Sequence, residues 1–267
     1  MTSCIVSTGA APVSNPVFRI RASQTKLLER VLAKAFYNDP CATYILPDAR
    51  RRRAAVSWFF ASVVIPASRH CSQAYTTVNI DGGALWIRLG NEFTIMQAAW
   101  APMTSLPFDL DRSSIARWVN VIGYLEVARR SLTDKPYWHL FALGTNPSEN
   151  ETEIRGKLIA PVLAEADLKR RSCYVETFQE KDLLFYQQQG FEIAGAGQIP
   201  KGPSFWVLIR RPFPETSCNL GPRILASCKL IAHTTCVAAS TSDSAAMGSG
   251  ASNQALQTII ITNSSVT

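Results

Sequence analysis

The sequence predicts an α/β protein, because helical and strand-like patterns alternate along most of its 267 residues. Two observations carry this prediction. In some segments apolar side chains recur at helical spacing, and in others they alternate with polar ones or are rich in β-branched and aromatic types. With 47% hydrophobic and 18% charged residues the chain can bury a full core, and no apolar run is long enough to span a membrane.

The first half of the chain is predicted to hold two helices and a β-hairpin. The expected elements are, in order, a strand at residues 17–23, a helix at 24–37, a helix at 52–64 and strands at 74–80 and 83–90. Asn38-Asp39-Pro40 ends the first helix, because proline cannot continue it. Asp81-Gly82 between the two later strands is a strong hairpin turn signal.

The second half is predicted to alternate helices with strands. The expected elements are a helix at residues 113–130, a strand at 136–145, a helix at 154–167, a strand at 172–178, a short helix at 182–189 and a last strand at 204–212. The helix at 154–167 is the clearest of them, because its apolar residues form one stripe: Ile154, Leu158, Ile159, Val162, Leu163 and Ala166.

Composition divides the chain into three parts. Residues 1–16 are expected to be a short flexible N-terminus, residues 17–212 the folded domain, and residues 213–267 a Ser/Thr/Ala-rich, disordered tail. Near the tail's end, "ALQTIIIT" is β-prone and is expected to add to a sheet edge or to aggregate. The N-terminus is faintly transit-like, but the first strand begins so early that we expect a cytoplasmic protein.

Charge and cysteine usage exclude several kinds of site. The net charge of +7 permits an acidic ligand, but the only dense basic run, residues 50–53, is typical of a solvated first helical turn. Aromatic residues do not interleave with positive charge, so no nucleic-acid partner is expected. Seven cysteines without CxxC spacing, and three scattered histidines, predict reduced and packed thiols and no metal site.

The order strand, loop, helix, strand and short helix, ending in "FYQQQGF", carries a resemblance to a known family. From residue 138 to residue 212 the chain resembles the GCN5-related N-acetyltransferases (GNAT), and it is most similar to the branch that contains puromycin acetyltransferase. "AKAFYNDP" and "GGALWIRLG" extend the resemblance into the first half. The resemblance implies a GNAT fold, with a central, mixed and mostly antiparallel sheet flanked by helices. It also implies acetyl-CoA as co-substrate.

The resemblance also implies where coenzyme A binds. In the family, the strand segment that matches Leu143, Gly144 and Thr145 parts from its neighbour and pairs with the pantetheine arm. The pyrophosphate then lies on a Gln/Arg-x-x-Gly-x-Gly loop, which falls here on Asn150, Glu153 and Arg155. All three depart from that pattern. Gly156 remains glycine one position later, and Arg155 and Lys157 offset part of the negative charge of the glutamates.

A structural interpretation of the same loop stands beside the cofactor one. Ser148 and Glu151, and likewise Asn150 and Glu153, have capping-box spacing, so the loop is also predicted to satisfy its own helix end. Acidic residues in a first turn complement the helix dipole by about 0.3–1 kcal/mol each. The sequence leaves both alternatives open: a phosphate loop that still works, and a loop filled by side chains.

Tyr186 is the catalytic candidate that the resemblance implies. In the family the tyrosine of this motif protonates the departing thiolate, which a phenol can do. The alternative is that Tyr186 only packs between Phe185 and Phe191. Asp182 stands where the family has asparagine, four residues earlier, in a position that faces the cofactor.

Two further residues are candidates for binding or deprotonating the acceptor amine. Glu176 is predicted to act directly or through water, and His139 is an alternative base on its strand. The alternative for Glu176 and for His139 is a purely structural role, in which the side chain makes a hydrogen bond within the protein on its strand.

The sequence thus predicts an N-acetyltransferase that moves an acetyl group from acetyl-CoA to a primary amine of a small molecule or peptide. The alternative is a GNAT-like binding module that has lost cofactor binding. Neither the acceptor nor the oligomeric state follows from the sequence.

Overall fold

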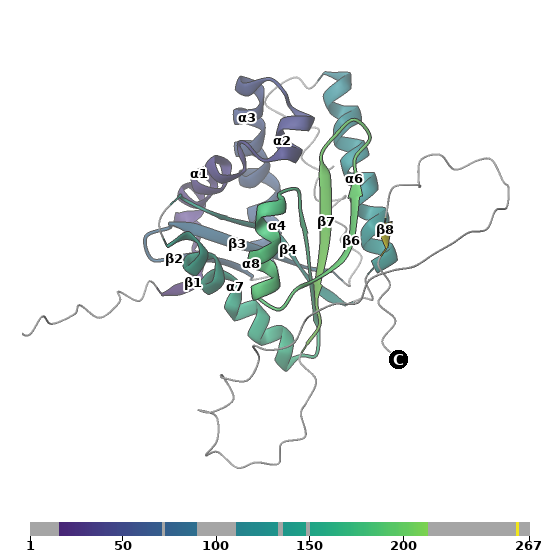
Figure 1. The fold of residues 1–267 in the computed structure, drawn as a ribbon. Helices are drawn as coiled ribbons and strands as arrows, with labels where there is room; N and C mark the ends of the chain where they lie inside the picture. The colour runs from purple at the N-terminus through teal and green to yellow at the C-terminus, as the bar shows by residue number, and fades with distance from the viewer. Residues whose placement is uncertain are drawn as a thin grey trace, which may run out of the picture. The chain divides into compact units, whose positions relative to one another are not determined.

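The protein is described from a computed structural model, which covers residues 16–70, 73–89, 111–132, 136–147 and 150–212 and the backbone of residues 260–261 (Figure 1). The expected N-terminal segment up to residue 15 and nearly all of the expected tail lie outside the described residues, so both remain predictions. None of the helices in the described ranges combines the length and the apolar character that a bilayer-spanning segment needs.

One sheet organises the fold. Its strands are β1 (Val17–Arg19), β2 (Ala74–Thr77), β3 (Gly82–Leu89), β4 (Tyr137–Thr145), β5 (Ser172–Thr177), β6 (Glu192–Gln198), β7 (Ser204–Arg210) and β8 (Ile260–Ile261). They lie in the order β1-β2-β3-β4-β5-β7-β6-β8. Neighbours are antiparallel except for β4 and β5, which are parallel because α7 connects them. The predicted mixed, mostly antiparallel sheet is confirmed.

Helices cover both faces of this sheet. They are η1 (Ala22–Gln24), α1 (Thr25–Phe36), α2 (Pro40–Ile45), α3 (Ala49–Phe59), η2 (Phe60–Val64), α4 (Ile65–His70), α6 (Arg112–Leu132), α7 (Glu151–Leu168), η4 (Glu180–Asp182) and α8 (Leu183–Gln188). α7 and α8 lie in front of the strands in Figure 1 and share one apolar cluster with them. The helices from α1 to α4, and α6, contribute to the clusters on the other face.

The sequence patterns missed α2 and β6, and the expected first strand at residues 17–23 is shorter than predicted, because residues 22–24 form η1. α2 begins at Pro40, because Asp39 caps it by accepting a hydrogen bond of 2.8 Å from the backbone N–H of Cys41. β6 was not predicted, since its run of alanine and glycine shows no strand-like alternation. The outer edge of β6 pairs with β8. The β-prone segment "ALQTIIIT" near the end of the chain had predicted such an addition to a sheet edge.

The expected helix at residues 52–64 is longer than predicted and changes its winding. It begins at Ala49, where Asp48 accepts from the N–H of Arg51 at 2.7 Å. Within η2 it is π-helical, and the N–H of Ile65 bonds to the carbonyl of Phe60. Pro66 comes directly after Ile65. Because proline has no backbone N–H, a π-helical turn at this point loses no hydrogen bond that Pro66 could have donated in a regular α-helix.

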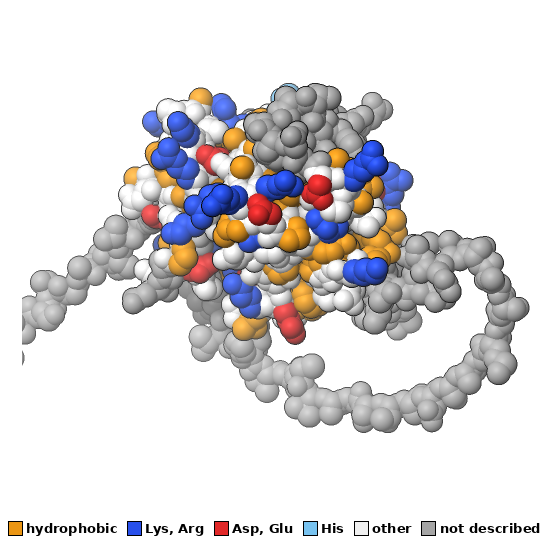
Figure 2. Space-filling view, turned by 90° about the horizontal axis from the view of Figure 1, so that it is seen from above, with side chains coloured by type: hydrophobic (Ala, Val, Ile, Leu, Met, Phe, Trp, Pro, Cys, Tyr) orange, Lys and Arg blue, Asp and Glu red, His pale blue; other side chains and the backbone are white. Residues whose placement is uncertain are grey.

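The basic run at residues 50–53 is only partly solvated. Arg50, Arg51 and Arg53 are exposed, and on the face seen in Figure 2 basic side chains lie among acidic and apolar ones. Arg52 is buried instead. Its guanidinium stacks 4.8 Å from the ring of Tyr37 and donates to the backbone carbonyls of Tyr37, Leu46 and Pro47 at 2.8–3.0 Å. Arg52 therefore ties α3 to the segment before it.

A pair of glycines lets α1 approach the middle of the sheet. Gly83 and Gly144 are cross-strand partners on β3 and β4. A Cβ at Gly83 would lie 2.5 Å from the side chain of Leu28, and a Cβ at Gly144 would lie 3.0 Å from that of Ala35. Both contacts are with α1, so this pair sets the distance between helix and sheet.

Gly144→Ala should therefore destabilise the fold by about 1–3 kcal/mol, because the added methyl meets α1 on a well-packed face. Gly123→Ala is the matched control. A Cβ at this position of α6 meets nothing within 4 Å, so that change should stabilise by about 0.5–1 kcal/mol. Chemical denaturation measures both, and equal midpoints for Gly144→Ala and the wild type would contradict the packing argument.

Candidate functional site

The site forms where β4 parts from β5. The pairing between them runs from Tyr137 and Ser172 to Leu140 and Val175 and stops there. At the next residue β4 has a bulge: Leu140 pairs with Trp86 of β3 and Ala142 with Leu85, so Phe141 between them has no partner. A bulge bends the bulged strand and raises its twist. The rest of β4 thus leaves β5 while it stays paired with β3.

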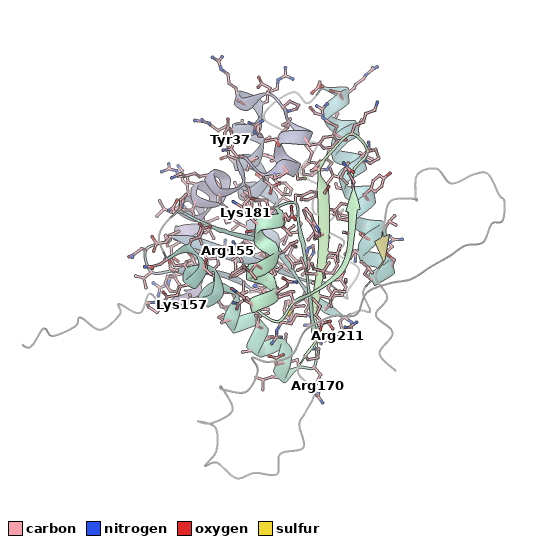
Figure 3. All side chains as sticks on the ribbon, viewed as in Figure 1. Tyr37, Arg155, Lys157, Arg170, Lys181 and Arg211 are labelled. Atoms are coloured by element: carbon pink, nitrogen blue, oxygen red, sulfur yellow. The ribbon has the colours of Figure 1, made fainter. Side chains whose placement is uncertain are left out.

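A cavity of about 1020 Å³ opens beside the parted strands. It is bordered by β4, the end of β5, α1, α6 and the starts of α7 and α8. Arg155, Lys181 and Tyr37 of its lining are labelled in Figure 3, where Tyr37 lies farther toward α3. Pockets for drug-sized ligands measure roughly 300–1000 Å³, so this cavity is at the large end of that range.

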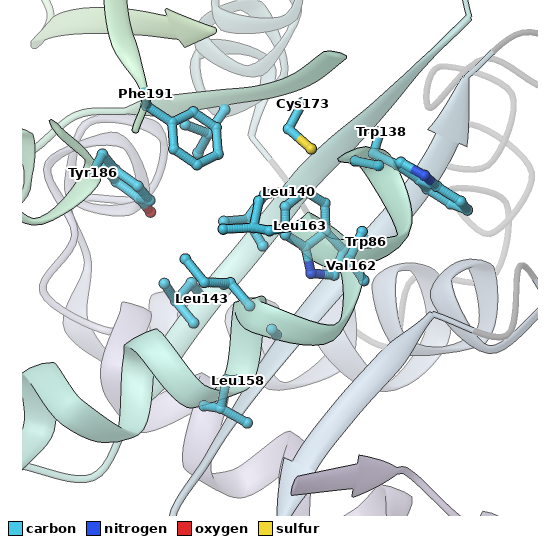
Figure 4. Packing of buried hydrophobic residues seen from close by; sticks show 14 of the residues in the cluster. Trp86, Trp138, Leu140, Leu143, Leu158, Val162, Leu163, Cys173, Tyr186 and Phe191 are labelled. Carbon is cyan, nitrogen blue, oxygen red and sulfur yellow. The ribbon is translucent and has the colours of Figure 1, made fainter. Parts of the chain in front are cut away.

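Tyr186 reaches the cavity from α8. Its ring packs edge-on against Phe185 and Phe191, at centroid distances of 5.3 and 5.7 Å. The ring of Tyr186 therefore does pack between these two residues, as the structural alternative predicts. The hydroxyl points toward the space beside Leu140 and Leu143 (Figure 4). Burial raises the pKa of Tyr186 to about 12, although the charge of Arg155 and a hydrogen bond to it oppose this shift. The phenol therefore stays protonated at physiological pH.

Glu176 and His139 form a pair on neighbouring strands. The His139 Nε2 lies 2.6 Å from a carboxylate oxygen of Glu176. Their side chains are only 3% and 12% exposed, and both line the cavity. The other ring nitrogen of His139 is buried and has no partner among the described residues. The two candidate bases of the sequence thus belong to one unit.

Arg155 and Asp182 form a second pair, across 27 residues of sequence. Arg155 donates to a carboxylate oxygen of Asp182 at 2.9 Å, and the two side chains are 12% and 15% exposed. The guanidinium also lies 4.2 Å from the ring centroid of Phe185 and 5.8 Å from that of Tyr186. Two residues that depart from the family pattern therefore contact each other, and this contact joins α7 to η4, directly before α8.

The start of α7 differs from the expected capping arrangement. The helix begins at Glu151, and Asn150 makes no side-chain cap, so the expected capping box between Asn150 and Glu153 is wrong. Glu153 instead pairs with Lys157 one turn on, at 2.5 Å. Glu151 turns back, accepts a hydrogen bond of 3.1 Å from Thr145 and lines the cavity. Ser148 lies outside the described residues.

The remaining predicted cofactor residues are divided between cavity and helix. On β4 beyond the bulge, the cavity is lined by Leu143, Gly144 and Thr145. The close packing of α1 against β4 is by itself a sufficient reason for a glycine at position 144, without any cofactor. Gly156 lies within α7 past its first turn, where backbone N–H groups bond within the helix. Gly156 and Lys157 are not part of the cavity lining.

Sequence patterns missed Asp39 and Gln179 as members of the site. Both line the cavity. Gln179, which lies 140 residues after Asp39 in the sequence, donates a hydrogen bond of 3.3 Å to its carboxylate. Burial raises the pKa of the Asp39 carboxyl, against the hydrogen bonds that it accepts. The sequence Asn38-Asp39-Pro40 is typical of a helix N-cap and could have identified Asp39 as the start of a helix. It could not have identified Gln179 as the hydrogen-bond partner of Asp39.

No protein-family model matches the sequence. Among solved structures, the chain is similar to a Corynebacterium glutamicum protein described as a histone acetyltransferase HPA2 and related acetyltransferase. The identity is 19%, the coverage 75% of this chain and 98% of that one, and the TM-score 0.50. It is also similar to the polyamine N-acetyltransferase of Drosophila melanogaster, at 15% identity, with 73% and 98% coverage and a TM-score of 0.52.

A third similar structure is the mosquito arylalkylamine N-acetyltransferase like 5b, at 8% identity, with 73% and 98% coverage and a TM-score of 0.50. At such identities the similarity shows the fold, and the puromycin acetyltransferase branch remains a prediction. The chain has the fold of the GCN5-related N-acetyltransferases, as the resemblance of its sequence had implied.

Proposed function

We propose that the protein transfers an acetyl group from acetyl-CoA to a primary amine by direct attack. One observation carries this proposal: the parted strands β4 and β5 border a single cavity that is lined by a protonated phenol, Tyr186, and by a histidine–carboxylate pair, His139 and Glu176. Amine acetylation requires an acid on one side of the reacting carbonyl and a base on the other.

Residues Leu143 to Thr145 would hold the pantetheine arm. Beyond Leu140 the β5 side of β4 has no strand partner among the described residues, so the peptide groups there can pair with an extended amide-bearing ligand. Backbone N–H groups at the first turn of α7 are the candidate donors for the pyrophosphate. Glu151 opposes an anion there, and its hydrogen bond to Thr145 fixes where its charge lies.

The residues of the cavity supply the two proton transfers. Glu176, alone or through His139, accepts the proton of the acceptor ammonium, which leaves an amine that can attack. As the new C–N bond forms and the thioester C–S bond breaks, the phenol of Tyr186 donates its proton to the departing thiolate. Acetyl-CoA supplies the activated acetyl group. The attacking nitrogen loses its second proton to solvent as the amide forms, solvent returns a proton to Tyr186, and Glu176 releases the first proton to solvent.

A second candidate function is a GNAT-like binding module. The observation that favours it is the ion pair of Arg155 with Asp182, which occupies Arg155 with a partner from the protein itself. A cofactor phosphate must compete with that carboxylate. Acetyl-CoA binding therefore separates the two candidate functions.

For the enzyme, we expect calorimetry to give an acetyl-CoA dissociation constant below the millimolar range. Asp182→Asn should tighten it about tenfold, or by ~1.4 kcal/mol, because the change removes a negative charge and releases Arg155 toward the phosphates. Glu180→Gln is the matched control: it removes the same charge from an exposed position on η4 and should change little. No binding to either variant would favour the module.

Tyr186→Phe keeps the ring packing and removes the acid. Turnover should fall about 10²–10⁴-fold, the usual range for the loss of an acid catalyst. Tyr75→Phe, which removes a phenol from β2 outside the cavity lining, should leave turnover unchanged. Initial rates of coenzyme A release measure both. If the two variants were equally active, the assignment of Tyr186 as the acid would be wrong.

The raised pKa of Tyr186 predicts a dependence of stability on alkaline pH. A raised folded-state pKa gives stability that is fully present below the unfolded value, about 10, and is lost as pH rises toward about 12. Relative to Tyr186→Phe, the wild type should lose about 1 kcal/mol of unfolding free energy between pH 8 and pH 11. Denaturation curves at each pH give this difference, and a constant one would contradict the raised pKa.

A further inference from the structure

A row of aromatic rings leads away from the histidine–carboxylate pair. The ring of His139 lies 5.6 Å from that of Phe141, which lies 6.0 Å from Phe59, which in turn lies 5.3 Å from Trp118. The rings come from β4, α3 and α6, and all of them line the cavity. The bulge at Phe141 thus begins a continuous aromatic wall.

These rings have surface available to a ligand. Phe59, Trp118 and Phe141 are only half-buried, although they lie in apolar clusters, because they border the cavity. α6 adds Ile122 and Leu125 to the lining of the same region. Such a wall offers a ligand ring edge-to-face or offset stacking in addition to the burial of apolar area.

We propose that the acceptor is an arylalkylamine, with its ring against Phe141 and Phe59 and its ammonium at Glu176. This inference rests on the proposed acetyl transfer.

The test compares 2-phenylethylamine, butylamine and spermidine as acceptors for the full-length protein with acetyl-CoA. We expect kcat/KM for 2-phenylethylamine to exceed that for the other two at least tenfold. Phe59→Leu should remove most of this preference by raising KM for the aryl substrate. Phe18→Leu is the matched control, because Phe18 is half-buried on β1 and does not line the cavity.

Equal use of butylamine, a preference for spermidine, or equal effects of Phe59→Leu and Phe18→Leu would overturn the aryl assignment while acetyl transfer stands. If no amine turns over, calorimetry with 2-phenylethylamine alone decides. Binding that Phe59→Leu weakens at least tenfold and Phe18→Leu does not would support an aryl-amine site and reject the transferase. Absence of binding would reject both.

Discussion

One extra residue in β4 is the constraint on which the site depends. At Phe141 the strand has a residue that β3 does not match, and at that point its pairing with β5 ends. Because the insertion also shifts the alternation of faces, Phe141 and Ala142 both pack with the helices of one face, while Leu143 belongs to the cluster on the other. Cavity, exposed strand edge and aromatic wall all follow from this single irregularity.

The altered cofactor loop has a simple physical interpretation. Arginine at a family glycine position and aspartate at a family asparagine position would each be unfavourable alone, since a half-buried charge without a partner is costly. Together Arg155 and Asp182 neutralise each other, and the face of Phe185 contacts the guanidinium. The contact connects the start of α7 with η4, which directly precedes the helix that carries Tyr186. The departures of the predicted cofactor loop from the family pattern therefore make an interaction within the protein.

Local patterns were sufficient for most of the fold. Periodicity over many residues predicted α1, α6 and α7, and the Asp81-Gly82 turn predicted the hairpin. Short elements escaped: α2 has six residues, and β6 is built largely from small residues that carry no pattern. The π-helical turn of η2, directly before Ile65 and Pro66, is likewise not visible in the periodicity of apolar residues.

Part of the candidate site could be predicted residue by residue, but its contacts could not. Sequence reasoning pointed to Tyr186, Glu176 and His139 and missed Asp39 and Gln179.

The contacts depend on tertiary structure. That His139 and Glu176 touch depends on the parallel register of two strands, and that Arg155 meets Asp182 depends on how α7 lies against η4. Residue types cannot supply such distances, because tertiary packing sets them.

Under the proposed function Asp39 would link folding to ligand binding. Burial raises the pKa of this carboxyl, so its ionised form is less favourable in the folded protein than in the unfolded chain. A cation bound beside it in the cavity would favour the ionised form. By mass action the folded state would then gain stability as the concentration of an ammonium-bearing ligand rises, even before any reaction occurs. The melting temperature of the protein would thus report which amines bind beside Asp39.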